Sequence, residues 1–495
     1  MNRIFLSFIL ASLSIWVLGQ EMDGSMRGRI EHVKSGRPRQ SLGQHRIGSS
    51  NMAPLRCMGS PRIPVILVQF PDLAFLEDKG NEGVNQLYKD FFNAAEGVQP
   101  GQSHCSVKEY FRSQSDGQFI PQFDIIGPVT LPQGYAYYGQ DKGGAMDIRI
   151  HEFYRHACQQ AIRGQIDWTL YDNDGNGTVD FVFFIYAGNG QNQQGMSSDY
   201  IWPKENMSSM TVKSDAQTGA DEESSEPFSV TFGAYGCTNE LYNGKIDGIG
   251  PCVHELCHGL GLPDFYDTNS VAYGMDYWDV MDSGCYKDGG YMPIGLSAYE
   301  RDFFGWKPLV ELDPDSAYYL TLRPLELDGV AYKVVNKANA NEYFILENRQ
   351  NIDTDLYLGW MNSYQYEEYG ANHGLMITHV DYSSSAWVMN TVNSNKSHQR
   401  MTLVPADGEL ISSITRTDGV WCKSTHGDLY PGDENQTEMS SYAVFHGKAL
   451  GQTINNITET TDGLIRLSIN GGKPEDSYDS EDQEGLFEPD IPEIR

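Results

Sequence analysis

Two histidines four residues apart, His254 and His258, are the side chains in this sequence with the clearest capacity for chemistry. On a helix this spacing places both imidazoles on one face, one turn apart, so that both can reach a single metal ion. Glu255 follows the first histidine and is placed to take a proton from a water molecule bound to that ion. The segment therefore predicts a metal site with a general base beside it.

The flanking residues predict how the helix that carries this pair begins and ends. Pro251 suits its first turn, because the amide hydrogen that proline lacks would have no partner there. Gly259 and Gly261 permit a helix end with positive φ, so the chain can turn back and bring Asp264 to the ion as a third ligand. Three protein ligands leave one tetrahedral position open, as a catalytic zinc requires. We therefore expect zinc on the histidine pair and Asp264; a buried structural helix is the alternative.

Residues 254–264 read H-E-x-x-H-x-x-G-x-x-D, which differs from the metzincin pattern at the last ligand, a histidine in metzincins. Met281 falls where a metzincin would have the methionine turn beneath the zinc ligands. By itself, a methionine in a glycine-containing turn is more often core filling. Tyr286 is a candidate phenol donor to the oxyanion formed during hydrolysis, although the sequence does not fix its direction.

A second candidate metal site lies in residues 172–180, which resemble the first nine positions of an EF-hand-type calcium loop. Gly177 makes the sharp turn that such a loop requires. Position twelve is Phe183 and not a bidentate glutamate, so a complete EF-hand is excluded, and an acidic turn is the alternative. The expected calcium ligands are the side chains of Asp172, Asp174, Asn176 and Asp180 and the carbonyl of Thr178.

The eight cysteines are an even number, which is compatible with disulfides in an exported chain, but the sequence does not select a pairing. Cys257 lies inside the predicted metal helix and is expected to be a small buried residue and not a ligand. Cys57 raises a further hypothesis, that its thiolate caps the zinc in a latent form. A structural or paired cysteine is the alternative.

The 495-residue chain has 35 basic and 67 acidic residues, a formal net charge of -32. This charge argues against nucleic acid or anionic lipid as a partner. It fits a secreted protein that binds calcium, although a solvated acidic surface is the simpler explanation. The apolar and aromatic content is that of an ordinary globular protein. Protein or peptide substrates are the partners expected from the peptide-bond hydrolysis described below, and the oligomeric state is not readable.

The N-terminal residues predict export, and the C-terminal residues predict disorder. Residues 1–19 read as a secretory signal peptide, with Arg3 before an apolar core and a small-residue cleavage site. The apolar run is too short to span a bilayer comfortably, so we expect an extracellular protein without stable membrane insertion. Residues 20–60 are polar and locally basic, which is typical of a pro-segment or flexible leader. Residues 471–495 are acidic and predict a disordered tail.

Between these ends the sequence predicts two domains. In residues 61–310 a buried-strand pattern at 63–70 is followed by helical patterns, which favours a mixed α/β (α+β) catalytic domain. In residues 311–470 short β-rich runs are separated by Asn, Asp and Gly, which indicates a mainly-β C-terminal domain.

With these residues in view, the chain resembles the immune inhibitor A-type family of secreted metallopeptidases. The zinc motif is the most specific part of the resemblance, and Cys257 departs from the small residue usual at its position. The matching segments are residues 65–72, 172–180 with 186–188, 201–203, 248–267 with 278–284, 293–306, 342–350 and 374–381. The resemblance implies a metzincin-like zinc endopeptidase with bound calcium, in which His254, His258 and Asp264 are ligands and Glu255 is the base.

The expected reaction is hydrolysis of internal peptide bonds by a zinc-activated water, with Glu255 passing the water's proton to the leaving amine. The aspartate ligand puts more negative charge on the ion than a neutral imidazole would, which makes the water less acidic. Hydrogen-bond donors behind the ligands could compensate for this charge. Two alternatives stay open: a catalytically silent, calcium-stabilised binding or adhesion protein, and a zinc amidase acting on a non-peptide substrate.

Overall fold

The computed structural model describes most of the chain between residues 55 and 478. The described residues are 55–76, 80–164, 166–193, 195–206, 208–213, 228–268, 272–352, 373–412, 427–439, 444–474 and 477–478. The predicted signal peptide, most of the predicted leader and most of the predicted acidic tail lie outside them. Among the described helices, none combines the length and apolar composition that crossing a membrane requires.

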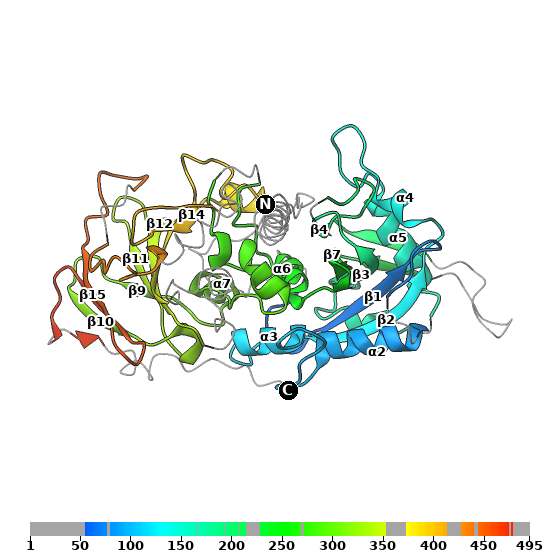
Figure 1. The fold of residues 1–495 in the computed structure, drawn as a ribbon, viewed down its shortest axis with the longest axis horizontal. Helices are drawn as coiled ribbons and strands as arrows, with labels where there is room; N and C mark the ends of the chain where they lie inside the picture. The colour runs from blue at the N-terminus through cyan, green and yellow to red at the C-terminus, as the bar shows by residue number, and fades with distance from the viewer. Residues whose placement is uncertain are drawn as a thin grey trace, which may run out of the picture. The chain divides into compact units, whose positions relative to one another are not determined.

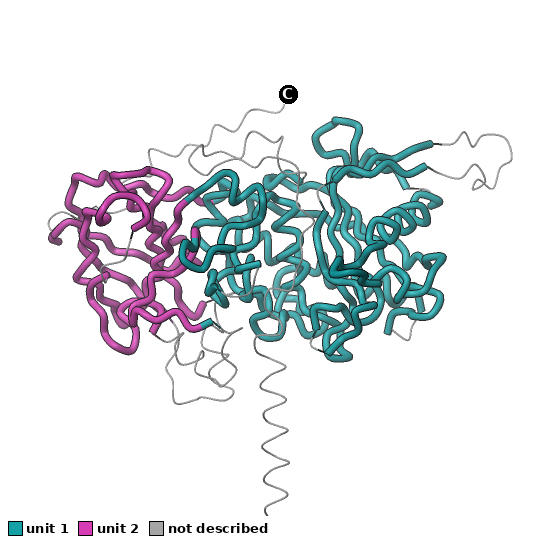
Figure 2. Tube along the Cα trace, turned by 90° about the horizontal axis from the view of Figure 1, so that it is seen from above, with its two compact units in different colours: residues 1–306, 382–399, 412–419 teal, residues 307–381, 400–411, 420–495 magenta. Residues whose placement is uncertain are grey.

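The chain folds into two compact units (Figure 2). The first contains Met1–Trp306, Tyr382–Gln399 and Ser412–Gly419, and the second contains Lys307–Asp381, Arg400–Ile411 and Val420–Arg495. The chain thus leaves the first unit after Trp306 and returns to it for residues 382–399. The domain limits predicted near residues 310 and 470 stay predictions.

The first unit is built on a six-stranded sheet with the order β2-β1-β3-β7-β4, in which β8 also pairs with β7. Its strands are β1 (Arg62–Gln69), β2 (Gln122–Thr130), β3 (Val182–Asn189), β4 (Lys204–Asn206), β7 (Tyr235–Tyr242) and β8 (Lys245–Ile246). The pairs β1–β2, β1–β3 and β3–β7 are parallel, whereas β4 and β8 run antiparallel to β7. Every residue of β1 between its two ends is buried, as expected for a strand covered on both faces. A separate pair, β5 (Met210–Lys213) and β6 (Ser229–Phe232), is antiparallel.

Helices cover both faces of this sheet (Figure 1). They are α2 (Gly80–Asn93), α3 (Val107–Gln114), α4 (Tyr135–Gly139) and α5 (Ile150–Ala161). The ring of Phe92 in α2 lies 6.1 Å from that of Phe183, and the ring of Phe153 in α5 lies 5.8 Å from that of Phe184. Since successive strand residues point to opposite faces, α2 and α5 pack on opposite sides of β3. The mixed α/β character predicted from the sequence is confirmed.

The second unit contains two further sheets. One has five strands in the order β14-β13-β12-β11-β9, and the other has four in the order β15-β16-β10-β17. A core that includes Leu320, Phe344, Ile377 and Leu467 fills the unit. The strands are β9 (Val310–Leu312), β10 (Tyr318–Leu322), β11 (Tyr332–Val335), β12 (Glu342–Arg349), β13 (Gly374–Asp381), β14 (Met401–Leu403), β15 (Ile454–Glu459), β16 (Ile465–Ile469) and β17 (Ser477–Tyr478). The short strand β17 lies within the predicted acidic tail, whose disorder stays a prediction.

Candidate metal centre

Helix α6 (Ile249–Gly259) carries the histidine pair, and every residue of it is buried. Its first turn packs tightly against the 3-10 segment η4 (Ser283–Gly290). A Cβ atom on Gly250 would lie 1.8 Å from the carbonyl oxygen of Cys285, so only glycine allows this approach. Pro251 lies in the same turn, as the sequence predicted. The helix start is therefore held by backbone contact with η4.

The end of α6 differs in one detail from the sequence prediction. Gly261, with φ of 110°, turns the chain back after the helix. Gly259 does not take part in this turn with a positive φ; it is still helical, and a Cβ atom there would lie 2.9 Å from the ring of Phe181. Gly259 therefore serves close packing, while the turn itself depends on Gly261.

The turn brings the three predicted zinc ligands together. The Nε2 atoms of His254 and His258 are 3.1 Å apart, and Oδ1 of Asp264 lies 3.3 Å and 3.4 Å from them. All three side chains are buried. A tetrahedral zinc with bonds of about 2.0–2.1 Å sets its ligand atoms roughly 3.3–3.4 Å apart. The separations fit a zinc ion.

The other ring nitrogens fix the tautomer of each histidine. Nδ1 of His254 lies 2.9 Å from the carbonyl oxygen of Val280, and Nδ1 of His258 lies 2.7 Å from that of Leu262. Since a carbonyl oxygen can only accept, both Nδ1 atoms carry the hydrogen. The two Nε2 atoms then face each other at 3.1 Å, and in neutral rings both would offer a lone pair to a cation between them.

The predicted methionine turn lies against this group. Met281 is fully buried, and its carbonyl oxygen accepts from the amide of Phe265 at 2.9 Å. The carboxylate of Asp279 accepts from the amide of Met281 at 2.8 Å and from the hydroxyl of Ser297 at 3.2 Å. The turn is thereby joined to the segment that follows Asp264.

Glu255 is fully buried beside the ligands, and two phenols share its surroundings. Burial, followed by the charges of Asp264 and Glu255 and a hydrogen bond with Asp264, raises the pKa of Tyr266 well above its usual value. Burial also raises the pKa of Tyr286, with smaller effects of Cys285, Asp247 and Glu255. Both phenols therefore hold their protons at neutral pH. Tyr286 was a sequence-based candidate; Tyr266 was missed, although it stands two residues after Asp264.

Asp264 has a further partner that the sequence did not indicate. Its amide donates to Oδ1 of Asn390 at 2.8 Å, and Nδ2 of Asn390 donates to its Oδ2 at 2.6 Å. The two residues are 126 positions apart, and no motif links them.

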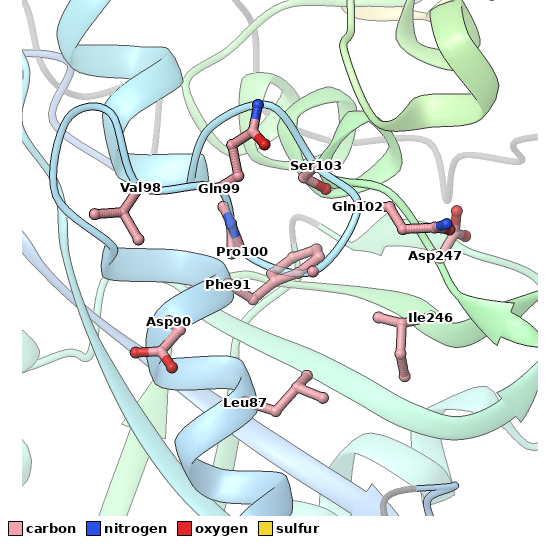
Figure 3. A pocket seen from close by; sticks show the side chains of 11 residues that line it. Leu87, Asp90, Phe91, Val98, Gln99, Pro100, Gln102, Ser103, Ile246 and Asp247 are labelled. Carbon is pink, nitrogen blue, oxygen red and sulfur yellow. The ribbon is translucent and has the colours of Figure 1, made fainter.

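A pocket of about 220 Å³ lies beside the start of α6, between α2 and the loop at residues 98–103 (Figure 3). Apolar side chains of Leu87, Phe91, Val98 and Ile246 line it, together with the carboxylate of Asp247. None of the three predicted zinc ligands is among its lining residues, so the pocket is separate from the ligand cluster.

The predicted calcium loop connects the 3-10 turn η2 (Trp168–Tyr171) to β3. Carboxylate oxygens of Asp172, Asp174 and Asp180 lie within 4.8 Å of one another. Burial, and then the charges of Asp174 and Asp172, raise the pKa of Asp180 to about 6. The charge on Asp180 is therefore costly without a cation, whereas, against the effect of burial, backbone hydrogen bonds from Gly177 and Asn176 lower the pKa of Asp172.

The other two predicted calcium ligands belong to the same turn. The side chain of Asn176 accepts from the amide of Thr178 at 2.9 Å and donates to Asp174 at 2.9 Å. The amide of Gly177 donates to Asp172 at 2.8 Å, and φ of Gly177 is 84°. These bonds also suit an acidic turn, so the calcium assignment depends on the three carboxylates.

Cys257 in the ligand helix and Cys57, the candidate latency residue, are both packing residues in this structure. Cys257 is fully buried, as predicted, and burial raises the pKa of its thiol well above the usual value. The thiol of Cys57 donates to the carbonyl of Phe304 at 3.5 Å, and burial raises its pKa to about 12. Cys57 is thus held as a thiol and does not join the ligand cluster in this structure. Buried free thiols are Cys57, Cys158, Cys237, Cys252, Cys257 and Cys285; Cys422 lies outside the described residues.

Comparison with known proteins places this geometry in context. Residues 58–307 match the family model described as immune inhibitor A peptidase M6, catalytic domain. The pre-pro-metalloprotease PrtV of Vibrio cholerae serotype O1 is 26% identical over 276 residues, which cover 49% of this chain and 29% of that protein. Immune inhibitor A of Bacillus thuringiensis subsp. alesti is 26% identical over 293 residues, which cover 51% of this chain and 41% of that protein. The match therefore spans less than half the length of either relative.

Proposed function

Since this chain belongs to the immune inhibitor A peptidase M6 family, we propose that it is a secreted zinc endopeptidase that hydrolyses internal peptide bonds of proteins. The observation that carries the proposal is the meeting of two Nε2 lone pairs and one Asp264 oxygen at separations of 3.1–3.4 Å. Such a donor set, buried and with one position left open, suits a catalytic zinc.

Each residue then has a role that follows from its position. His254, His258 and Asp264 would hold the zinc, which when bound supplies a Lewis acid that acidifies water and polarises the scissile carbonyl. Glu255 would take a proton from the attacking water and deliver it to the leaving amine. Tyr266 and Tyr286, both protonated and buried near Glu255, are the candidate donors to the developing oxyanion.

We further propose that the first unit is metzincin-like. The parallel sheet with its antiparallel edge strand β4, the helix α6, and the buried Met281 directly after Val280, whose carbonyl lies 2.9 Å from Nδ1 of His254, support this arrangement. We also propose that residues 172–180 bind calcium, because three carboxylates converge there. The proposal also includes the domain organisation. Residues 1–19 would direct export, and residues 20–60 would form a leader. Residues 61–310 would form the catalytic domain and residues 311–470 a mainly-β domain.

Zinc analysis combined with casein zymography tests the activity. The purified chain is expected to contain zinc and to cleave casein, to stop after treatment with a zinc chelator, and to recover when zinc is added back. A protein that holds zinc but leaves casein and other proteins intact would instead support the amidase. A protein that takes up no zinc would support the silent binding protein.

A further inference from the structure

The residues that complete the zinc site extend beyond the part of the chain that the family model covers. Residues 382–399 belong to the first unit, yet the matched region ends at residue 307. We call residues 382–399 the return segment. It begins with the short helix α9 (Ser384–Val388) and continues as a loop along the residues that follow Asp264.

Trp387 anchors the return segment in the first unit. Its side chain is buried, and its indole Nε1 donates to the hydroxyl of Tyr299 at 2.6 Å. The ring lies 6.5 Å from that of Phe265, the residue next to Asp264. The segment is therefore fixed by packing immediately beside the metal ligand.

Further along, polar side chains bind the loop that continues from Asp264. The side-chain Nδ2 of Asn393 donates to the carbonyl of Phe265 at 2.6 Å. The hydroxyls of Ser394 and Thr268 are 2.9 Å apart, and the side chain of Gln399 accepts from the amide of Gly274 at 2.7 Å. These contacts hold the return segment in one register against this loop.

Both polar atoms of the Asn390 side-chain amide form hydrogen bonds with Asp264. Its Oδ1 accepts from the backbone amide of Asp264 at 2.8 Å, and its Nδ2 donates to the carboxylate Oδ2 at 2.6 Å. With Oδ2 held in this way, Oδ1 is the oxygen that faces His254 and His258, at 3.3 Å and 3.4 Å. The carboxylate is thereby oriented to offer one oxygen to the metal.

The backbone explains why asparagine can occupy this place. Asn390 has φ of 53°, in the left-handed region that asparagine tolerates better than most residues. Its amide donates to the carbonyl of Trp387 at 3.3 Å, so the turn that ends α9 presents the side chain to Asp264.

We propose that Asn390 is a positioning residue for the zinc site, and this inference rests on the proposed function. Its donor takes up part of the negative charge on the outer oxygen of Asp264. A carboxylate ligand in place of a neutral imidazole by itself makes the zinc-bound water less acidic. The hydrogen bond from Asn390 offsets this loss of acidity. Asn390 thus orients a predicted zinc ligand from a position outside the matched catalytic-domain model.

Zinc affinity of full-length variants, measured by competition with a chelating indicator, tests this role. Asn390→Gly removes the amide while keeping a residue that accepts positive φ, and Asn390→Asp replaces the donor with an oxygen. Asn395→Gly is the matched control, because Asn395 is exposed in the same segment and its side chain accepts from the amide of Ser397.

We expect Asn390→Gly to raise the zinc dissociation constant about 10- to 100-fold, Asn390→Asp to raise it at least as much, and the control to stay within about twofold of wild type. A second readout is the dependence of kcat on pH for zinc-loaded Asn390→Gly. We expect the acidic limb of this profile to shift to higher pH.

Equal zinc affinity in wild type and both Asn390 variants would overturn the inference while leaving the zinc site intact. If Asn390→Gly does not fold, the zinc dissociation constant of the isosteric Asn390→Asp variant tests the inference. Absence of zinc binding in wild type would overturn the proposed function itself.

Discussion

The carbonyl oxygen of Val280 lies 2.9 Å from Nδ1 of His254 and fixes the ring so that Nε2 faces the other two predicted zinc ligands. The next carbonyl, that of Met281, accepts from the amide of Phe265 at 2.9 Å, directly after Asp264. Two successive peptide groups of the methionine turn therefore orient residues on both sides of the metal site. Because outer contacts of this kind set ligand geometry and basicity, the backbone of this turn would act on a bound metal through the predicted ligands.

The first prediction concerns Glu255. Replacing it with glutamine keeps the shape of the side chain but removes the proton acceptor, so Glu255→Gln should retain zinc and lose activity by about 10²- to 10⁴-fold. Zinc content and the rate of casein cleavage are measured on the same preparation. Glu82→Gln, at an exposed position in the first turn of α2, should behave as wild type. Cleavage by Glu255→Gln at the wild-type rate would remove Glu255 from the mechanism.

Much of this candidate site is predictable because its predicted ligands are close in sequence. Helical periodicity sets His254 and His258 on one face, and the turn at Gly261 returns the chain at Asp264, so local rules suffice. Asn390 was not predictable, because its contact depends on the path by which the chain returns to the first unit. A lone asparagine in a β-rich stretch carries no such signal.

Gly259 also differed from its prediction because of a contact with a distant element, whereas the strand β1 agreed with its prediction. Gly259 was expected to permit the turn through a positive φ, but it is helical, and the ring of Phe181 occupies the space that a side chain there would need. A strand near residues 63–70 was predicted, and β1 spans Arg62–Gln69, since a continuous apolar run is a strong local signal. Local patterns thus identified elements, whereas contacts between distant elements required the structure.

The second prediction concerns the tight contact between α6 and η4. A Cβ atom at residue 250 would lie 1.8 Å from a backbone oxygen, so Gly250→Ala must displace α6. We expect a loss of roughly 3 kcal/mol or more in unfolding free energy together with weaker zinc binding. Urea unfolding and zinc titration measure the two effects. Gly164→Ala is the control, because its nearest atom would be 3.3 Å away; equal losses in both variants would contradict the contact argument.

The third prediction concerns calcium. If the carboxylates of residues 172–180 bind the ion, calcium should raise the Tm of a chelator-stripped sample, and calorimetry should show binding heat. Asp174→Asn removes one charge at nearly constant shape, so it should weaken calcium binding strongly. Asp433→Asn, at an exposed position in the second unit, should leave it unchanged. An absence of binding heat in wild type would support the acidic turn.

The fourth prediction uses Asp247, which lies just before α6 and lines the pocket of Figure 3. Burial raises its pKa from 3.8 to about 7, against the opposing hydrogen bonds from Gly248 and Asn239. The folded state therefore holds this proton more tightly than the unfolded state. The resulting stabilisation is present below pH 4 and is lost as pH rises through the folded pKa near 7.

Asp247→Asn should remove this dependence, because the amide does not titrate. Between pH 4 and pH 7 the wild type should lose up to about 4 kcal/mol of stability relative to this variant. Urea unfolding at several pH values measures the difference. If the unfolding free energies of the two proteins changed with pH in parallel, Asp247 would not have the raised pKa.

The fifth prediction concerns the buried ion pair next to the edge strand β4. Nζ of Lys204 lies 2.6 Å from Oδ2 of Asp147, and both side chains are almost wholly buried. Removing one partner leaves an uncompensated charge in the interior, so Asp147→Asn should cost about 3–5 kcal/mol in unfolding free energy. Adding Lys204→Met to that variant removes the stranded ammonium, so the double variant should recover part of the loss. A double-mutant cycle by urea unfolding measures the coupling, and additive effects would mean that the pair contributes no mutual stabilisation.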